Sequence, residues 1–236
     1  MRPGPPHHPV EVPPGYPRAF ERELQLSDGR TALIRPIVPE DCERLAHAIR
    51  TADQDTVQRR FLGTPPHITP ALLTHLCTVD YRKRFALVAW DPLTAAGTAI
   101  ARYEPTVEGT AEVAVAVDPS WRRVGLATAL IEMLAEAALD RGIHAFSAYY
   151  LAENQPVSAL LALAGSGGRQ TIKEGFTEAS VALDRTSVKA AIQRLKPEHC
   201  SRVRCRSGAA ADPAEAVPSG GEGQAEATAE PPRRAE

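Results

Sequence analysis

The amino-acid sequence predicts an α/β fold of the α+β kind, in which a mixed sheet carries helices on its faces. Three observations support this fold class. Segments with the two-residue period of strands alternate with segments of helical period along the chain. Residues 111–140 form the pattern of a strand, a turn and an amphipathic helix, and a hairpin pattern follows further along the chain. A mixed sheet covered by helices is the economical way to bury all of these apolar faces.

The first half of the chain predicts a hairpin, a group of helices and two further strands. Ser27-Asp28-Gly29 makes a turn between two short strands, and Pro36 ends the second one. Pro39 with two acids after it predicts a helix start, and Thr69 predicts an N-cap. The predicted elements are strands at 24–26 and 31–35, a helix at 39–50, a loop with a short helix at 51–63, a helix at 70–76, and strands at 85–90 and 97–103.

We expect the rest of the fold to be organised around residues 111–140. The valine-rich run at 113–117 predicts a strand, and Asp118-Pro119 ends it because proline cannot continue a strand's hydrogen-bond ladder. A helix with one acidic, solvent-facing side follows, and Gly142 stops it. Its apolar residues are Leu126, Leu130, Ile131, Leu134, Ala138 and Leu139, and its acidic residues are Glu132, Glu136 and Asp140.

The C-terminal part of the domain predicts a strand, a short helix and a hairpin. The strand covers residues 144–151, and Gln155-Pro156 opens a short helix at 157–163. The glycine-rich residues 165–168 predict a break in the chain. Two runs with the strand period, at 169–173 and 176–183, flank Glu174-Gly175 and form the expected hairpin.

Composition predicts one domain between two tails. The 236 residues suffice for one sizeable hydrophobic core. Residues 1–19 are rich in proline, and residues 196–236 consist largely of Ala, Gly, Pro and Glu. Such segments bury too little apolar surface to offset the entropy lost on ordering, so we expect both to be disordered. The folded domain is expected at residues 20–195.

Charge and cysteine content exclude several classes of partner. The net charge is −2 with both signs mixed, so neither nucleic acid nor a membrane surface is an expected partner. No apolar run is long enough to cross a membrane, and the proline-studded start does not resemble a secretory signal. We therefore expect a cytoplasmic protein with free thiols and no metal, although a zinc or disulfide site at His199-Cys200 and Cys205 stays an alternative. The four cysteines are Cys42, Cys77, Cys200 and Cys205.

The turn between the central strand and its helix has the composition of an anion site. Backbone N–H groups converge at a helix N-terminus, where the helix dipole is positive, and Gly125 lets a ligand approach the backbone closely. A Walker A loop would need Gly-Lys-Ser/Thr, and Leu126-Ala127-Thr128 follows Gly125 instead. A dinucleotide fingerprint would need three glycines, and only one is present.

The remaining pattern, Arg122-x-x-Gly125-x-Ala127 directly after Val117-Asp118-Pro119, resembles the pyrophosphate-binding motif of the GNAT superfamily of N-acetyltransferases. The resemblance covers residues 24–183. More narrowly, the sequence resembles the acetyltransferase domain of the Pat-type bacterial protein lysine acetyltransferases. It implies the GNAT fold: a central mixed, mostly antiparallel sheet with helices on both faces, splayed at the cofactor site, where acetyl-CoA is the cosubstrate. The further segments that carry it are residues 28–41, 59–63, 79–89, 111–114 and 151–154. An ordinary strand-to-helix connection with a solvated arginine pair stays the alternative.

Glu112 is the candidate catalytic base. A lysine amine titrates near 10.4 in water, so a carboxylate must accept its proton before or as the nitrogen attacks. Glu112 begins the central strand, and the small Ala114 and Ala116 share its face and leave space beside it. Pat-type enzymes are similar in placing a base glutamate at the matching position. A strand-end glutamate in a surface ion pair is the alternative.

The resemblance also implies the residues that hold the cofactor. Backbone N–H groups of the central strand, at Val115 to Val117, would stabilise charge on the thioester oxygen. Asn154 matches an asparagine that contacts the cofactor, and an N-cap before Gln155-Pro156 is its alternative role. Many family members carry a tyrosine acid in the following helix, and this sequence has none there, with Tyr149 and Tyr150 on the preceding strand instead. The pyrophosphate-binding residues are Arg122, Arg123, Val124, Gly125, Leu126, Ala127 and Thr128.

The predicted activity is acetyl-CoA-dependent N-acetyl transfer to a primary amine by direct attack in a ternary complex. The Pat-like segments favour a protein lysine as the acceptor. Two alternatives remain: acetylation of a small-molecule amine, and a non-catalytic protein that binds acetyl-CoA and regulates a partner. A monomer and a homodimer are both compatible with the sequence.

Overall fold

The computed structural model describes residues 12–62 and 67–195. Residues 1–11 of the expected tail at 1–19 and the whole of the expected tail at 196–236 therefore lie outside the described residues. The strands of the described part are β1 (Arg22–Gln25), β2 (Thr31–Pro36), β3 (Phe85–Trp90), β4 (Gly97–Pro105), β5 (Thr110–Val117), β6 (Ala145–Leu151), β7 (Gly165–Lys173) and β8 (Phe176–Leu183). Its α-helices are α1 (Cys42–Thr51), α2 (Gln54–Phe61), α3 (Pro70–Cys77), α4 (Leu126–Leu139), α5 (Gln155–Ala164) and α6 (Arg185–Arg194). Short 3-10 turns lie at Arg18–Phe20, Pro39–Asp41 and Pro119–Trp121.

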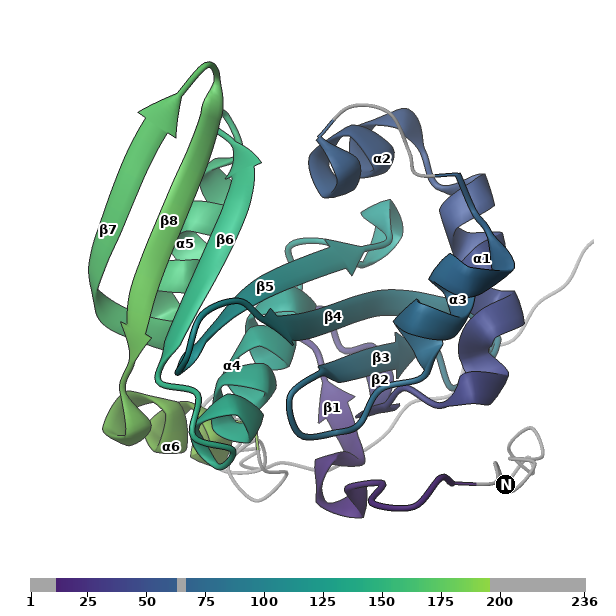
Figure 1. The fold of residues 1–236 in the computed structure, drawn as a ribbon. Coiled ribbons are helices and arrows are strands. Elements are labelled where there is room, and N and C mark those ends of the chain that lie inside the picture. The colour runs from purple at the N-terminus through teal and green to yellow at the C-terminus, as the bar shows by residue number, and fades with distance from the viewer. Residues whose placement is uncertain (1–11, 63–66, 196–236) are drawn as a thin grey trace, which may run out of the picture.

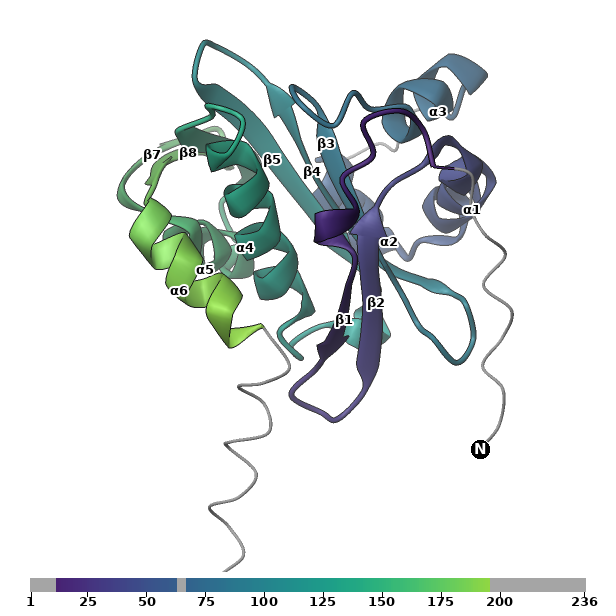
Figure 2. The same cartoon turned by 90° about the horizontal axis from the view of Figure 1, so that it is seen from below.

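The strands form one sheet in the order β1-β2-β3-β4-β5-β6-β8-β7 (Figure 1). Neighbouring strands are antiparallel except β5 and β6, which are parallel and joined through α4. The predicted mixed, mostly antiparallel sheet is therefore confirmed. Seen from below, α4 and α6 lie on one side of the sheet and α1 and α3 on the other (Figure 2). The predicted cover of helices on both faces is confirmed as well.

The helix after the central strand differs from its prediction. It was expected to turn an acidic side to solvent, but Glu132 is only 5% exposed. Its carboxylate lies 3.4 Å from Arg194 Nη2 of α6. Burial raises the pKa of Glu132, and the nearby Arg194 opposes this shift. The expected solvent-facing side is thus wrong at Glu132, because α6, an element that was not predicted, packs against α4.

The start of β7 also corrects the sequence prediction. The glycine-rich residues 165–168 were expected to break the chain, but β7 begins at Gly165 directly after α5. The backbone of β8 passes so close that a Cβ atom on Gly165 would collide with the Ala182 carbonyl, so only glycine fits. Gly167, with φ of +68°, lies in the irregularity between Ser166 and Arg169. The glycines therefore serve strand pairing rather than chain termination.

Ordered packing begins upstream of residue 20. Tyr16 packs edge to face on Tyr81 with ring centroids 5.7 Å apart, and Phe20 is buried against Phe85. The segment at 12–19 thus covers part of the core. The domain boundaries proposed from composition stay a prediction. No helix within the described ranges is long and apolar enough to cross a membrane.

A buried ion pair fixes the entry into α1. Arg35 of β2 donates two hydrogen bonds of 2.7 Å to the Asp41 carboxylate, which also accepts one from the Val38 N–H at 3.0 Å. Asp41 is 3% exposed. The pair therefore ties β2 to the turn that starts the helix.

We predict that Asp41→Asn lowers the free energy of unfolding by about 3–5 kcal/mol, because it leaves the partly buried Arg35 guanidinium without its counter-charge. Chemical denaturation monitored by circular dichroism measures this change. Glu40→Gln, an exposed neighbour, is the matched control and should stay close to wild type. A loss of less than about 1 kcal/mol in Asp41→Asn would contradict the role given to the pair.

Candidate functional site

The central feature of the site is the early end of pairing between β5 and β6. Their parallel register covers three residue pairs only, the last being Glu112 with Ser147, whereas β5 stays paired with β4 through Val117. Beyond Glu112 the two strands diverge (Figure 1). The expected splay of the sheet is therefore present, and it opens next to Glu112.

The geometry of β5 shows which backbone groups face the opening. The Asp118 N–H donates to the Thr98 carbonyl of β4 at 2.8 Å, whereas the Val117 carbonyl accepts from Arg122 Nε at 3.1 Å. The N–H and C=O of one strand residue point to the same side, and this side alternates along the strand. The N–H groups of Val115 and Val117 therefore point away from β4 toward the opening.

The turn after β5 presents the backbone of a helix N-terminus. Gly125, the N-cap of α4, has φ of +91°, and no side chain within the described residues caps the helix there. A Cβ on Gly125 would have no neighbour within 4 Å, so the space in front of the turn is open. Arg123 also has a positive φ, of 60°. Unpaired first-turn N–H groups together with the helix dipole suit a phosphate.

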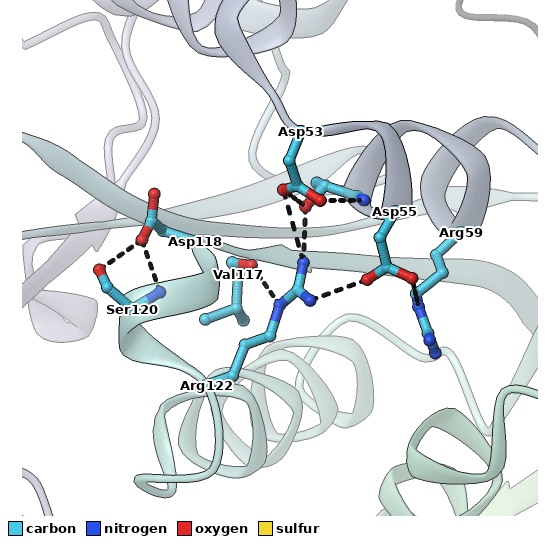
Figure 3. Close-up of polar contacts among 8 residues, drawn as sticks. Asp53, Asp55, Arg59, Val117, Asp118, Ser120 and Arg122 are labelled. Atoms are coloured by element: carbon cyan, nitrogen blue, oxygen red, sulfur yellow. Dashed lines mark hydrogen bonds and ion pairs between the residues drawn. The ribbon is translucent and has the colours of Figure 1, made fainter.

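Arg122 does not reach into this space, because α2 holds its side chain (Figure 3). Its Nη1 donates to Asp55 Oδ2 at 2.9 Å and its Nη2 to Thr56 Oγ1 at 2.5 Å. From the other side, Arg30 donates to the Ser120 carbonyl at 2.8 Å and lies 4.1 Å from the centre of the Trp121 ring. Contacts from α2 on one side and from Arg30 on the other thus hold the turn in place. The backbone N–H groups of the turn stay accessible to a ligand.

Helix α2 also reaches across the opening between β5 and β6, to the residue that precedes α5. Arg59 donates to Asp55 Oδ1 at 2.6 Å, and its Nη1 lies 3.4 Å from Asn154 Oδ1. Asn154 is 5% exposed and makes no side-chain hydrogen bond to the start of α5, so its alternative role as an N-cap is not adopted. Sequence analysis missed the roles of Asp55, Thr56 and Arg59. Only the charge pattern of α2 signalled them, because their partners lie far along the chain.

Glu112 is exposed and lies opposite Glu104 in the register between β5 and β4. Glu104 has three nitrogen atoms of other side chains around it: Arg102 Nη2 at 2.7 Å, His75 Nε2 at 3.1 Å and Arg84 Nε at 3.8 Å. Arg60 of α2 approaches both carboxylates. Burial lowers the pKa of Arg60, while the negative charges of Glu112 and Glu104 act in the opposite direction. Glu112 therefore lies in a charged cluster beside the opening rather than in an isolated surface pair.

The two tyrosines of β6 have different surroundings. Tyr149 is half exposed and stacks on Phe176 with centroids 5.3 Å apart. Tyr150 is buried, and its hydroxyl has no hydrogen-bond partner among the described residues. No group of three or more His, Cys, Asp or Glu side chains within the described ranges could hold a metal ion. Cys42 and Cys77 are free thiols, and the alternative site at Cys200 and Cys205 lies outside the described residues.

Comparison with known proteins agrees with this geometry. A family model described as acetyltransferase (GNAT) family matches residues 47–165. An acetyltransferase of Pseudomonas aeruginosa is 33% identical over 150 residues, which are 61% of this chain and 80% of that protein. Acetyltransferase Pat of Mycolicibacterium smegmatis is 30% identical over 142 residues, which are 58% of this chain and 42% of that longer protein. The crystal structure of the GNAT domain of PAT from S. lividans superposes with a TM-score of 0.64 at 28% identity, covering 71% of this chain and 99% of that domain.

The fold and the open turn at the splay are those of an acyltransferase that uses acetyl-CoA. The chain belongs to the acetyltransferase (GNAT) family, and it is an N-acetyltransferase of the GNAT fold. The predicted resemblance is confirmed. The open amides at Gly125 and the separated strands fit acetyl-CoA as the cosubstrate, which the family uses.

We predict that the contact between α2 and the turn weakens in acid. Hydrogen bonds from Thr56 to Asp53 and from Arg59 to Asp55 hold the pKa values of these two carboxyls below the ordinary 3.8. A lowered folded-state pKa contributes stability that is present above the ordinary value and is lost as the pH falls through the lowered one. Hydrogen exchange of the α2 amides should therefore accelerate below about pH 4, while the α4 amides stay protected. Equal acceleration in both helices would indicate global unfolding instead.

Proposed function

We propose that this protein transfers the acetyl group of acetyl-CoA to a primary amine of a protein lysine, by direct attack in a ternary complex. The observation that carries the proposal is the opening between β5 and β6, which begins where Glu112 pairs with Ser147 and leads to the open turn at Gly125. Acetyl-CoA supplies the acetyl group as a thioester. The residues of the chain orient this thioester, accept the proton of the amine and stabilise developing charge.

Cofactor binding is assigned to the turn and to two positions beside the opening. The backbone of residues 122–128 would bind the pyrophosphate through N–H groups at the start of α4, with Arg122 bracing the turn and Arg123 adding positive charge. Asn154 would contact the rest of the cofactor. The N–H groups of Val115 and Val117 would donate to the thioester oxygen as it gains negative charge, since both face the opening.

Glu112 is assigned as the general base. It is exposed at the end of the paired segment, so it can accept a proton from the attacking amine directly or through a water molecule. Arg60 of α2 interacts electrostatically with Glu112, so a cation lies near the proposed base. A charged base beside the opening supports an enzyme over a non-catalytic binding protein. The leaving thiolate does not depend on a tyrosine in α5, because thiols titrate near 8.5.

The lysine acceptor is supported by two of the three relatives named above, which are Pat proteins and are 28–30% identical to this chain. A small-molecule amine is the second candidate, and a large cavity beside Glu112 favours it. We further propose a cytoplasmic protein, supported by the free thiols of Cys42 and Cys77. The oligomeric state, a monomer or a homodimer, stays a prediction. Incubation with labelled acetyl-CoA and a panel of proteins and small amines tests the acceptor class directly.

We predict that Gly125→Glu weakens acetyl-CoA binding at least about tenfold, or about 1.4 kcal/mol. The new side chain would place a negative charge where the pyrophosphate binds. Titration calorimetry measures the affinity. Gly142→Glu is the matched control, because Gly142 also has a positive φ and open space around it but follows the far end of α4. Equal affinities in Gly125→Glu and the control would remove the turn from the binding site.

We predict that Glu112→Gln lowers turnover at neutral pH by about 10²–10⁴-fold, because the amide keeps the shape but cannot accept the amine proton. Acetyl-CoA affinity should stay close to wild type, since the turn is unchanged. The deficit should shrink as the pH rises toward the titration of the amine near 10.4, where the acceptor arrives deprotonated. Pre-steady-state kinetics across this pH range provide the measurement. A deficit of constant size at every pH would show that Glu112 positions the substrate and is not the base.

A further inference from the structure

A cavity of about 950 Å³ lies between the sheet and the helices α1, α2 and α3. The alternation of side chains along the strands decides which residues form its floor. Ala114 and Ala116 lie on the same face of β5 as Glu112, two and four residues further along, so the cavity begins next to the proposed base. The floor residues are Val88 and Trp90 of β3, Thr98, Ile100 and Arg102 of β4, and Ala114 and Ala116 of β5.

The roof of the cavity is apolar. Leu45 and Ile49 of α1, Val57 and Phe61 of α2, and Leu72 and Leu76 of α3 line it. All six side chains are only partly buried, and Leu45 also packs against the edge of the core. The volume is that of a site for a drug-sized ligand, roughly 300–1,000 Å³. The thin alkyl chain of one lysine residue would leave most of it unfilled.

Three polar atoms of the floor lack the hydrogen bonds that their burial requires, whereas Arg102 Nη1 donates to the Leu76 carbonyl at 3.3 Å and Arg102 Nη2 lies 2.7 Å from Glu104 Oε1. Trp90 Nε1, Thr98 Oγ1 and Arg102 Nε are buried and have no hydrogen-bond partner among the described residues. Thr98 is 2% exposed and Arg102 is 5% exposed. Buried polar groups in folded proteins are almost always paired, and an unpaired one costs free energy. Three of them in the lining of one cavity indicate that a ligand supplies the missing acceptor.

The charges around the cavity favour a ligand that carries a hydrogen-bond acceptor. Three of the four carboxylates that line it are already engaged: Asp41 by Arg35, Asp53 by the Thr56 N–H and Asp118 by the Ser120 N–H. The fourth, Glu43, is exposed on α1 and does not belong to the floor. The unpaired groups of the floor are Trp90 Nε1, Arg102 Nε and the Thr98 hydroxyl, all of which can donate, and Arg60 lies in the lining near Glu112. A carbonyl or carboxylate group suits such an environment, and a second cation does not.

We propose that the cavity binds the body of the acceptor: a primary amine joined to a bulky apolar group that bears a carbonyl or carboxylate. The apolar group fills the space under α1 and α2, the carbonyl or carboxylate accepts from Trp90, Thr98 or Arg102, and the amine reaches Glu112. Two sources share this chemistry, namely a lysine next to an aromatic or large aliphatic residue in a polypeptide, and a free small amine. The inference rests on the proposed function, which it deepens by naming the substrate class.

The first test fills the cavity. Ala116→Leu adds three carbon atoms to the floor of the cavity. Because less space is then left for a bulky group, this substitution should raise KM for phenylalanine amide roughly tenfold and leave KM for n-butylamine unchanged. Ala71→Leu, at an exposed position of α3 outside the cavity, is the matched control and should change neither. An equal rise in KM for both amines, or no rise for either, would overturn the proposal.

The second test removes an unpaired polar group. Thr98→Val keeps the shape but lacks the hydroxyl, so it should raise Tm in the free protein, because a buried orphan group is gone. It should also lower the preference of the enzyme, in kcat/KM, for phenylalanine amide over 2-phenylethylamine, which lacks the carbonyl. A substitution with a merely structural effect would not change this ratio. An unchanged ratio would remove Thr98 from acceptor recognition, and with an unaltered Tm it would contradict the argument from the unpaired groups.

The third test distinguishes the two sources and separates the cavity from catalysis. The chain has two tryptophans, so Trp121→Phe leaves Trp90 as the only fluorescent reporter in the cavity. Its emission should shift on titration with phenylalanine amide or with a Lys-Phe peptide, and not with n-butylamine or a Lys-Gly peptide. A response to the peptide alone assigns a polypeptide acceptor, and a response to the amide alone assigns a small amine. No response to either overturns the inference, whereas a response in this variant without acetyl transfer to any acceptor by the wild-type protein leaves it standing and refutes the proposed function.

Discussion

The separation of β5 from β6 is the constraint on which the rest of the molecule depends. Three parallel residue pairs hold the two halves of the sheet together, and the pairing stops at Glu112. From there to Val117, β5 keeps its hydrogen bonds to β4 but turns every second N–H toward an open edge. Backbone N–H groups are obligatory donors, so an edge of this kind inside a domain needs a partner other than a strand.

Helix α2 compensates for the missing strand pairing. It contacts the turn through Arg122 and the start of α5 through Arg59 and Asn154, so it spans the two halves that the sheet leaves apart. These ion pairs are largely exposed, and exposed pairs add little to the free energy of folding. Their effect is geometric. They hold the Arg122 side chain away from the open space at Gly125, where we propose that the pyrophosphate binds.

Local sequence patterns predicted much of this arrangement, because they record local physics. The valine run, Asp118-Pro119 and Gly125 predict a strand, its end and a glycine turn within fifteen residues, and the structure has all three, with a positive φ at Gly125. Interactions between distant segments could not be predicted in the same way. The burial of Glu132 depends on α6, about sixty residues along the chain, and the start of β7 depends on how closely β8 passes Gly165. The contacts of α2 with Arg122 and Asn154 belong to the same group.

The alternation of side chains along β5 shows how one strand serves both the fold and the site. Ala111 and Val113 are buried under α4 and stabilise the core, whereas Glu112, Ala114 and Ala116 face the helices α1 to α3. Larger residues at the alanine positions would fill the cavity and gain buried apolar area. The chain instead leaves about 950 Å³ open over buried, unpaired polar groups. Local choices that disfavour folding are expected at functional sites, so the small side chains of β5 connect Glu112, the proposed base, to the space proposed for the acceptor.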